Sequence, residues 1–302
     1  MTRFPFTSKC AWLMAGVVSL AAVAGCGAGK GSDGGATSPT APSPPSPSQT
    51  IVYTAIGASD AAGVGSSAVC VPFTECPNGM GYVQVVVRRL SEGRQVKLTN
   101  LGVPGAVLSP EIQSLSGQYP PSAPTNFIAS EMPFVARDST LVTIFAGGND
   151  TNVVGRAAER GAGGSDPAGY IDQQVRGFGT SFSTLLQGIR QRAPSARIVV
   201  ANLPNMAGLP YAAGYTQTQR QGLQRISVGF TTQVINQLTS QGVVVVDMMC
   251  DARSYDPANY SSDGFHPNDR GYAYIADMFV NAILSGSAPP PRASCAQMSL
   301  VP

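Results

Sequence analysis

The fold of this chain is decided by one stretch of sequence, which reads Ile51-Val52-Tyr53-Thr54-Ala55-Ile56-Gly57-Ala58-Ser59-Asp60. The run up to Ile56 is apolar, aromatic or β-branched, which suits a strand that is covered on both faces. Ser59 follows directly, and ligands of parallel sheets collect beyond the carboxyl ends of the strands. A nucleophilic serine would stand at this position, although a serine after a strand is also a common turn or helix-cap residue.

Similar runs recur at wide spacing along the chain. They are Val96–Leu101, Thr140–Ala146, Arg197–Asn202 and Val243–Met248. Apolar residues at helical spacing lie between or after them, in three groups: Tyr82, Val86, Leu90; Leu223, Ile226, Phe230, Val234, Leu238; and Tyr272, Ile275, Phe279, Ile283. In the first group, Val85-Val86-Val87 alone could form a strand. Strands that alternate with helices indicate βαβ units. We therefore expect an α/β fold, a three-layer α/β/α sandwich around a parallel sheet of about five strands.

The helix that contains Leu223 also has a recognisable start. Thr216 is followed three residues later by Gln219, the spacing of a capping box. We expect this helix to begin directly after Thr216.

The chain has a single histidine, His266, in the segment Asp263-Gly264-Phe265-His266-Pro267. Histidine is the usual general base because its unperturbed pKa lies near neutrality. Asp263 lies three residues upstream and could orient the ring. Any histidine-dependent chemistry of this protein must therefore use His266.

Four segments together resemble the SGNH, or GDSL-like, hydrolase family. In chain order they are Gly57-Ala58-Ser59-Asp60-Ala61-Ala62-Gly63, Asn100-Leu101-Gly102-Val103-Pro104-Gly105, Gly147-Gly148-Asn149-Asp150 and Asp263-Gly264-Phe265-His266-Pro267. The last two fit the family patterns Gly-x-Asn-Asp and Asp-x-x-His-Pro. One position departs from the family, because Ala58 stands where an aspartate usually precedes the serine.

The resemblance implies the family's flavodoxin-like α/β/α fold and the hydrolysis of carboxylic esters, with no metal and no organic cofactor. It implies a triad of Ser59, His266 and Asp263. Chemically, His266 would take the serine proton, and Asp263 would fix the imidazole tautomer. It also implies an oxyanion hole made of the Ser59 N–H, the Gly105 N–H and the Asn149 amide.

Each of these residues has a plainer role when taken alone, as a turn or helix-cap residue. Their joint occurrence in family order favours catalysis. Two alternatives remain open. The same site could pass the acyl group to a sugar or lipid hydroxyl, as an acyltransferase does. The chain could also be a non-catalytic lipoprotein that binds envelope glycans, with Ala58 as the sign of a relic site.

The first 26 residues have the features of an export signal. Arg3 and Lys9 precede an apolar run, Ala11–Ala24, that is short for a membrane span. The run ends in Val23-Ala24-Gly25-Cys26, which resembles the lipobox of bacterial lipoproteins and implies lipidation of Cys26. We expect an exported, lipid-anchored protein of the cell envelope, at the outer membrane or cell surface. An ordinary signal peptide with an incidental cysteine is the alternative.

Residues 27–50 are rich in Gly, Ser, Thr and Pro, which predicts a tether, and residues 51–302 then form one domain. Cleavage of the signal removes Arg3 and Lys9, so 19 basic residues minus 2 leaves 17, equal to the 17 acidic residues. Because the mature chain has no net charge and no basic stripe, nucleic acid is not an expected partner.

Four cysteines remain in the domain, an even number that suits an oxidising compartment. Of the three possible pairings we favour Cys70–Cys76 with Cys250–Cys295, because the partners lie near one another in the sequence. Buried free thiols are the alternative.

The acyl pocket is predicted in the segment 115–137. Its apolar residues are Phe127, Ile128, Met132 and Phe134, and its several prolines disfavour a long lid helix. These residues could equally pack the segment onto the domain. The segment 151–170 resembles a Gly-rich loop beside Asn149. A groove with one apolar wall favours short or medium acyl chains. The sequence leaves the alcohol part of the substrate (small-molecule, lipid or glycan) and the oligomeric state open.

Overall fold

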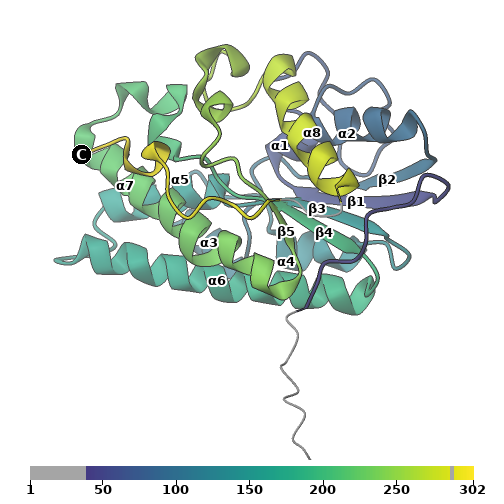
Figure 1. The fold of residues 1–302 in the computed structure, drawn as a ribbon. Helices are drawn as coiled ribbons and strands as arrows, with labels where there is room; N and C mark the ends of the chain where they lie inside the picture. Colours follow the sequence, from purple (N-terminus) through teal and green to yellow (C-terminus); the bar gives the residue numbers. More distant parts are fainter. Residues whose placement is uncertain (1–38, 286–288) are drawn as a thin grey trace, which may run out of the picture. The chain divides into compact units, whose positions relative to one another are not determined.

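The apolar runs of the sequence form a five-stranded parallel sheet. A computed structural model describes residues 39–285 and 289–302. The strands are β1 (Ile51–Gly57), β2 (Val96–Asn100), β3 (Leu141–Phe145), β4 (Arg197–Ala201) and β5 (Val244–Val246). They lie in the order β2-β1-β3-β4-β5 (Figure 1). The predicted fold, with its five strands, is confirmed.

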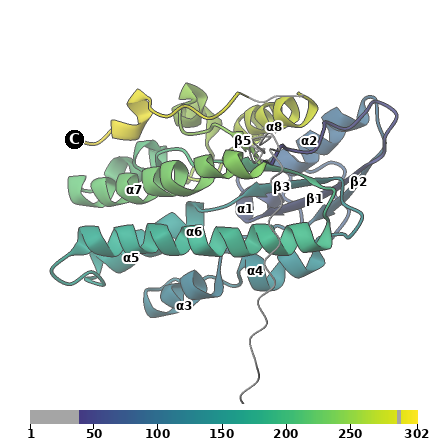
Figure 2. The same ribbon diagram turned by 60° about the horizontal axis from the view of Figure 1, so that its bottom comes forward.

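Helices cover both faces of this sheet (Figures 1 and 2). One face is covered by α2 (Tyr82–Ser91) and α8 (Asp269–Leu284). The other face is covered by α3 (Pro110–Gln118), α4 (Phe127–Ser130), α5 (Gly148–Glu159), α6 (Pro167–Arg192) and α7 (Gln217–Gly229). The short α1 (Ser59–Ala62) follows β1 directly. Single helical turns fill the connections, at Met132–Phe134, Met206–Gly208, Pro210–Gly214, Ala252–Tyr255, Pro257–Asn259 and Ala296–Ser299.

Neighbouring residues of each inner strand pack into opposite layers. In β4, Ile198 and Val200 join the core beneath α6, whereas Val199 and Ala201 join the core beneath α8. Because both faces are buried, a polar alternation would leave unpaired groups in the core. This is why the strands read as continuous apolar runs.

The three predicted helical stripes are helices in the structure. The residues Tyr82, Val86 and Leu90 lie in α2. The run Val85-Val86-Val87, which could have formed a strand, is therefore helical. The stripe of Leu223 forms α7, which continues through a π-helical turn (Phe230–Ile235) and a 3-10 turn (Asn236–Gln241). The predicted capping box of Thr216 and Gln219 is present at the start of α7.

Within the segment 151–170, the predicted loop is present where the glycines cluster, at Gly161–Gly164 between α5 and α6. The rest of this segment belongs to these two helices. The apolar side chains of α6 do follow a helical period, but Gly177, Gly179 and Gly188 interrupt the pattern in the sequence. At Gly179 an added Cβ would lie 3.3 Å from Val234, which is a tight contact. Within the described residues no helix is both long enough and apolar enough to cross a membrane.

Both predicted disulfides are present, Cys70–Cys76 and Cys250–Cys295. The first closes a small loop after α1, and the second ties the end of β5 to the C-terminal segment.

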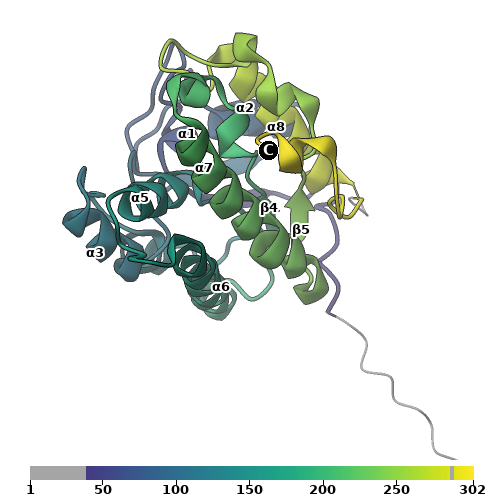
Figure 3. The same cartoon turned by 90° about the vertical axis from the view of Figure 1, so that its left-hand side faces the viewer.

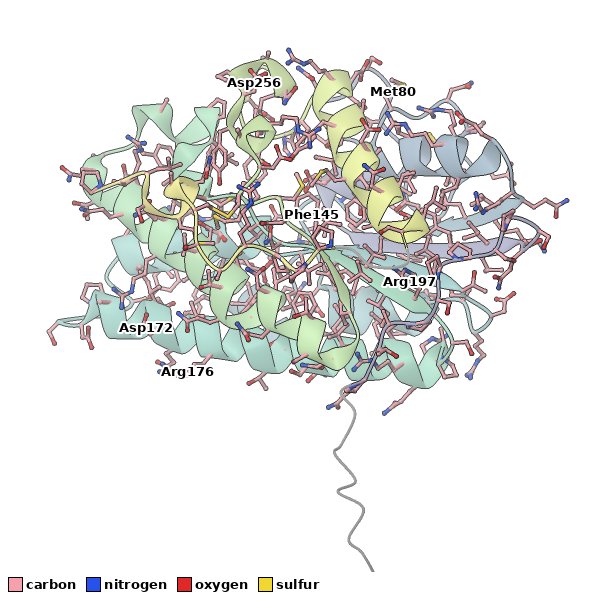
Figure 4. The ribbon with its side chains drawn as sticks, viewed as in Figure 1. Met80, Phe145, Asp172, Arg176, Arg197 and Asp256 are labelled. Carbon is pink, nitrogen blue, oxygen red and sulfur yellow. A yellow bond between two sulfur atoms is a disulfide. The ribbon has the colours of Figure 1, made fainter. Side chains whose placement is uncertain are left out.

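The described part of the N-terminal segment lies against the domain. The guanidinium of Arg197, which is 2% exposed, donates to the carbonyl oxygen of Pro42. It also donates to the carbonyl oxygens of Ala282 and Ser285 at the end of α8, at 3.1 and 3.0 Å. Residues 39–50, which we assigned to the tether, therefore begin the packed region near the amino end of β4, where Figure 4 labels Arg197. The predicted signal segment, with Cys26, lies outside the described residues.

Candidate active site

Strand register brings three of the predicted site segments to one edge of the sheet. β1 pairs with β2 on one side and with β3 on the other, with Ala55 opposite Asn100 and Gly57 opposite Phe145. Ser59, the loop that contains Gly105, and Asn149 each follow one of these three strands. Parallel strands end at the same edge, so the three segments converge beyond the sheet.

Ser59 is the first residue of α1 and is 4% exposed. The helix is only four residues long, because Gly63 adopts a left-handed conformation with φ of 82°. The close approach of Gly63 to Gly81 also excludes a side chain, since an added Cβ would lie 2.7 Å from the Gly81 backbone. The turn that presents Ser59 is thus fixed by backbone contact.

The buried carboxyl group of Glu131 binds the backbone just before this turn. Its Oε2 accepts the N–H of Gly57 at 3.0 Å, and the carbonyl oxygen of Gly57 in turn accepts the N–H of Val103 at 3.3 Å. Burial raises the pKa of Glu131 well above its usual range, and hydrogen bonding to the Gly57 N–H opposes this effect. Gly57 therefore connects Glu131 to the loop before Gly105. The contact spans 74 positions, and no pattern in the sequence indicates it.

The histidine loop is organised around the carboxylate of Asp263. Its Oδ2 lies 2.6 Å from Nδ1 of His266, and its Oδ1 accepts the backbone N–H groups of Phe265 and His266 at 2.9 Å. The Ser261 hydroxyl also donates to Oδ1. Burial acts to raise the pKa of Asp263, but these hydrogen bonds outweigh it and hold the pKa well below its usual value. Asp263 therefore stays ionised beside the ring.

The histidine loop and the serine segment touch each other. An added Cβ on Gly65 would lie 2.7 Å from the Cβ of His266, so the two backbones pack closely. The hydroxyl of Tyr272 donates to the carbonyl oxygen of Val64 at 2.6 Å, which ties the segment to α8. Asp60, the neighbour of Ser59, is a second carboxyl near the ring: burial raises its pKa, and the charge of His266 opposes this.

Hydrogen bonding separates the two candidate glycines of the second block. The Gly102 N–H is occupied, because it donates to Asn100 Oδ1 at 3.1 Å. Among the described residues, the N–H groups of Gly105 and Ser59 have no acceptor. Gly105 has a φ of 82°, a conformation that favours glycine. These two N–H groups are therefore available as oxyanion donors.

Asn149 lies beside the same loop. Its Nδ2 donates to the carbonyl oxygen of Ala106 at 2.8 Å, which leaves one amide hydrogen for a ligand. The next residue, Asp150, is buried and accepts the Leu108 N–H at 2.9 Å. Burial raises the pKa of Asp150 to about 7, and the N–H donors oppose this effect. Asn149 and Asp150 together hold the loop 105–108 against the start of α5.

An apolar pocket of about 60 Å³ lies beside these groups. Ala58 and Asn149 form part of its wall, and Phe127, Phe145 and Met206 line its interior. Of the four residues that we predicted for an acyl pocket, only Phe127 lines it.

The other three predicted pocket residues lie outside that wall. Ile128 and Met132 pack against the core beneath α6. Phe134 is 58% exposed and makes an edge contact with Phe73. Most of the pocket wall comes from the ends of β3 and β4, from the segment that contains Met206 and from the region between Met248 and Ile275, which the sequence does not bring together.

Metal ligands are not gathered at this edge. Over residues 39–285 and 289–302, no group of three or more His, Cys, Asp or Glu side chains is arranged to hold a metal ion.

Comparison with known proteins identifies the chain's family. Residues 55–274, which contain all four site segments, match the GDSL-like Lipase/Acylhydrolase family. The chain belongs to this family. The family resemblance of the sequence is confirmed, and the chain is an ester-hydrolysing enzyme.

Solved structures agree with this GDSL-like fold. The lipase Lip_vut3 from a goat rumen metagenome has a TM-score of 0.51 at 18% identity, over 81% of this chain and 100% of its own. An extracellular lipase from Streptomyces rimosus has a TM-score of 0.52 at 16% identity, over 78% and 100%. Phospholipase A1 from Streptomyces albidoflavus NA297 has a TM-score of 0.52 at 17% identity, over 78% and 99%. No curated protein matches the chain.

The raised pKa of Asp150 makes a prediction about stability. The folded state keeps a proton on Asp150 up to about pH 7, whereas the unfolded chain releases it near the ordinary aspartate pKa of about 3.9. Wild-type stability should therefore lose a contribution of roughly 3 to 4 kcal/mol as the pH rises from about 4 to about 7. In Asp150→Asn the amide still accepts the Leu108 N–H, and this loss should disappear.

Urea unfolding at several pH values between these limits measures the effect as the difference between variant and wild type. Asp138→Asn, which changes an exposed carboxylate, is the matched control and should keep the wild-type pH dependence. A constant difference between Asp150→Asn and wild type across this pH range would contradict the assignment.

Proposed function

We propose that this hydrolase cleaves carboxylic esters through an acyl-serine intermediate on Ser59. The observation that carries the proposal is the 2.6 Å contact between Asp263 Oδ2 and His266 Nδ1. With Nδ1–H donating to the carboxylate, Nε2 carries the lone pair and can act as the base. The contact between Gly65 and His266 supports the placement of this ring beside the segment that begins at Ser59.

The reaction would proceed in two steps. First, Nε2 of His266 takes the proton of the Ser59 hydroxyl while the oxygen attacks the ester carbonyl carbon. The resulting oxyanion accepts hydrogen bonds from the N–H groups of Ser59 and Gly105 and from the amide of Asn149. The intermediate expels the alcohol, which receives the proton from His266. Water, activated by the same ring, then releases the carboxylic acid and restores Ser59.

Asp263 would hold the ring in the productive tautomer and stabilise the imidazolium during each step. Its low pKa keeps it ionised beside the ring. Glu131 would contribute indirectly, because it accepts the N–H of Gly57 and so holds the backbone just before the turn of Ser59.

The export signal and lipid anchor form a second part of the proposal. Val23-Ala24-Gly25-Cys26 supports lipidation of Cys26 after cleavage, which would hold the enzyme on a membrane of the cell envelope. The two disulfides suit the oxidising compartment that this location implies.

Substitution of the triad tests the mechanism. Ser59→Ala and His266→Ala should each remove nearly all esterase activity, and the double variant should be little worse, because triad members act as a unit. Asp263→Asn should keep a small residual activity, reduced by roughly four orders of magnitude. The readout is kcat/KM on a soluble acetyl ester, with exposed Asp138→Asn as a control that should stay fully active. Full activity in folded Ser59→Ala would exclude Ser59 as the nucleophile.

The small apolar pocket predicts a preference for short acyl chains. A pocket of about 60 Å³ accepts an acetyl or butyryl group, whereas an octanoyl or palmitoyl chain would have to leave it for solvent. Measured kcat/KM should therefore fall steeply beyond butyryl. Met206→Ala enlarges the pocket and should move the preference toward longer chains, and Met278→Ala, outside the pocket, should not. A native preference for palmitoyl esters contradicts this assignment of the pocket.

Fractionation of cells that express the full chain tests the anchor. The wild-type protein should sediment with membranes and carry a lipid-sized mass increment at its N-terminus. Cys26→Ala should accumulate as an uncleaved precursor or be released as soluble protein. Cys10→Ala, inside the signal but outside the lipobox, is the matched control and should behave as wild type. Identical fractionation of the Cys26→Ala and wild-type proteins, with no lipid on either, would refute lipidation.

A further inference from the structure

A second carboxyl group lies near the histidine ring, in addition to that of Asp263. It belongs to Asp60, which directly follows Ser59 in α1. α1 lies beside α2 (Figure 3). The loop that contains His266 packs against the same segment, since a Cβ added to Gly65 would lie 2.7 Å from the His266 Cβ. The mechanism proposed above gives Asp60 no role.

The carboxyl group of Asp60 has no partner in the site. Asp60 is half-buried and forms part of the wall of the apolar pocket, as does Phe265, the neighbour of His266. Within the described part of the chain, its carboxyl group belongs to no ion pair and accepts no hydrogen bond from another side chain. Arg253, also in the pocket wall, is bound by Asp251 at 2.6 Å. The charge of Asp60 is therefore not compensated by a direct contact.

Among the described residues, five ionisable groups interact with the carboxyl group of Asp60. Two belong to the histidine loop. Burial raises the pKa of Asp60, the charge of His266 opposes this effect, and the charge of Asp263 adds to it. The other three are hydroxyl groups from α2, from α8 and from the segment before the histidine loop: Tyr82, Tyr272 and Tyr260.

The charge state of most of these neighbours is fixed. Burial raises the pKa of all three tyrosines, so they keep their protons and stay neutral. Asp263 stays ionised, because its hydrogen bonds hold its pKa well below the usual value. Of the five groups, His266 is therefore the one whose charge changes in the proposed reaction. The charge of Asp60 acts mainly on that ring.

An acidic residue in the first turn of a helix has a plainer role, because it interacts favourably with the helix dipole. α1 is only four residues long, so few peptide dipoles add up in it. That role also requires no burial. It does not account for a half-buried carboxyl group in the pocket wall that interacts with the ring of His266.

We propose that Asp60 acts through His266, as a second negative charge that stabilises the imidazolium formed when the ring takes the serine proton. Asp263 binds Nδ1 directly, whereas Asp60 acts at longer range, without a hydrogen bond to the ring. The proposal rests on the function proposed above, because the imidazolium forms in the acyl-serine mechanism. Asp60 touches no reacting atom. It is a positioning residue that holds the proton on the ring until the alcohol leaves.

The first test observes the ring directly and requires no catalysis. The chain contains one histidine, so its imidazole gives a single set of NMR signals in untagged protein. Full-length Ser59→Ala protein is compared with Ser59→Ala Asp60→Asn protein as the pH is varied. Loss of the negative charge should make the ring release its proton at a pH lower by roughly one unit, which is a tenfold change in proton affinity. Identical titration curves for the two proteins overturn the proposal.

The second test is the pH profile of kcat/KM on a soluble acetyl ester. In Asp60→Asn the plateau should fall roughly tenfold, because the imidazolium of the transition state loses a stabilising charge. The acid limb should move to lower pH by roughly one unit, because the ring now stays neutral in more acidic solution. The fall should lie in kcat rather than in KM. A merely structural defect would lower the whole profile and leave its acid limb in place.

Three further variants separate charge from shape. Asp60→Ser removes the same charge with a smaller side chain and should give the same two shifts. Asp60→Glu keeps the charge and should restore the position of the acid limb. Asp138→Asn removes an exposed carboxylate outside the pocket and should match the native enzyme. Thermal unfolding confirms that each variant is folded.

Two kinetic results would contradict the role of Asp60. One is an acid limb that stays in place in both Asp60→Asn and Asp60→Ser. The other is a loss of activity that lies in KM alone, which would mean that Asp60 only shapes the pocket. Failure of the acyl-serine mechanism is detected separately, by the absence of ester turnover in the native enzyme. The NMR titration still decides in that case whether Asp60 acts on the ring.

Discussion

The candidate site depends on the parallel pairing of β1 with both of its neighbours. β1 carries Ser59 at its carboxyl end, and the strands on either side carry the loop of Gly105 and the start of α5. A shift of one residue in either pairing would turn the buried side chains of a strand to the opposite layer. The apolar contacts of both layers therefore fix the register, and the register fixes the relative positions of three of the four site segments.

Buried carboxyl groups then hold these segments together. Glu131 accepts the N–H of Gly57, whose carbonyl oxygen accepts the N–H of Val103, and Asp150 binds the loop that follows Gly105. Neither has a cationic partner among the described residues, so both lower the stability that the domain would otherwise have at neutral pH. Asp263 is the opposite case, because its many donors favour the ionised form. Burial thus raises the pKa of the two carboxyl groups that bind backbone N–H groups, whereas hydrogen bonds lower the pKa of the carboxylate beside the histidine.

Local signals were sufficient to predict the strands, three helices, both disulfides and the family. The capping box of Thr216 and the single histidine are examples, because each is visible within a few residues. Long-range features could not be predicted in this way. Glu131 contacts a residue 74 positions away, and the pocket is assembled from the ends of several strands. The choice of Gly105 over Gly102 came from the family resemblance. In the structure Asn100 Oδ1 accepts the N–H of Gly102, whereas the N–H of Gly105 has no acceptor among the described residues.

The hydrogen bonds of Arg197 have a mechanical consequence. The Arg197 guanidinium binds the N-terminal segment at the amino end of β4, whereas the candidate site lies beyond the carboxyl ends of the strands. A pulling force that enters through the N-terminus is therefore transmitted to Arg197 and the end of α8 before it reaches β1. The turn that contains Ser59 and the loop that contains His266 are not among the segments that first receive this force.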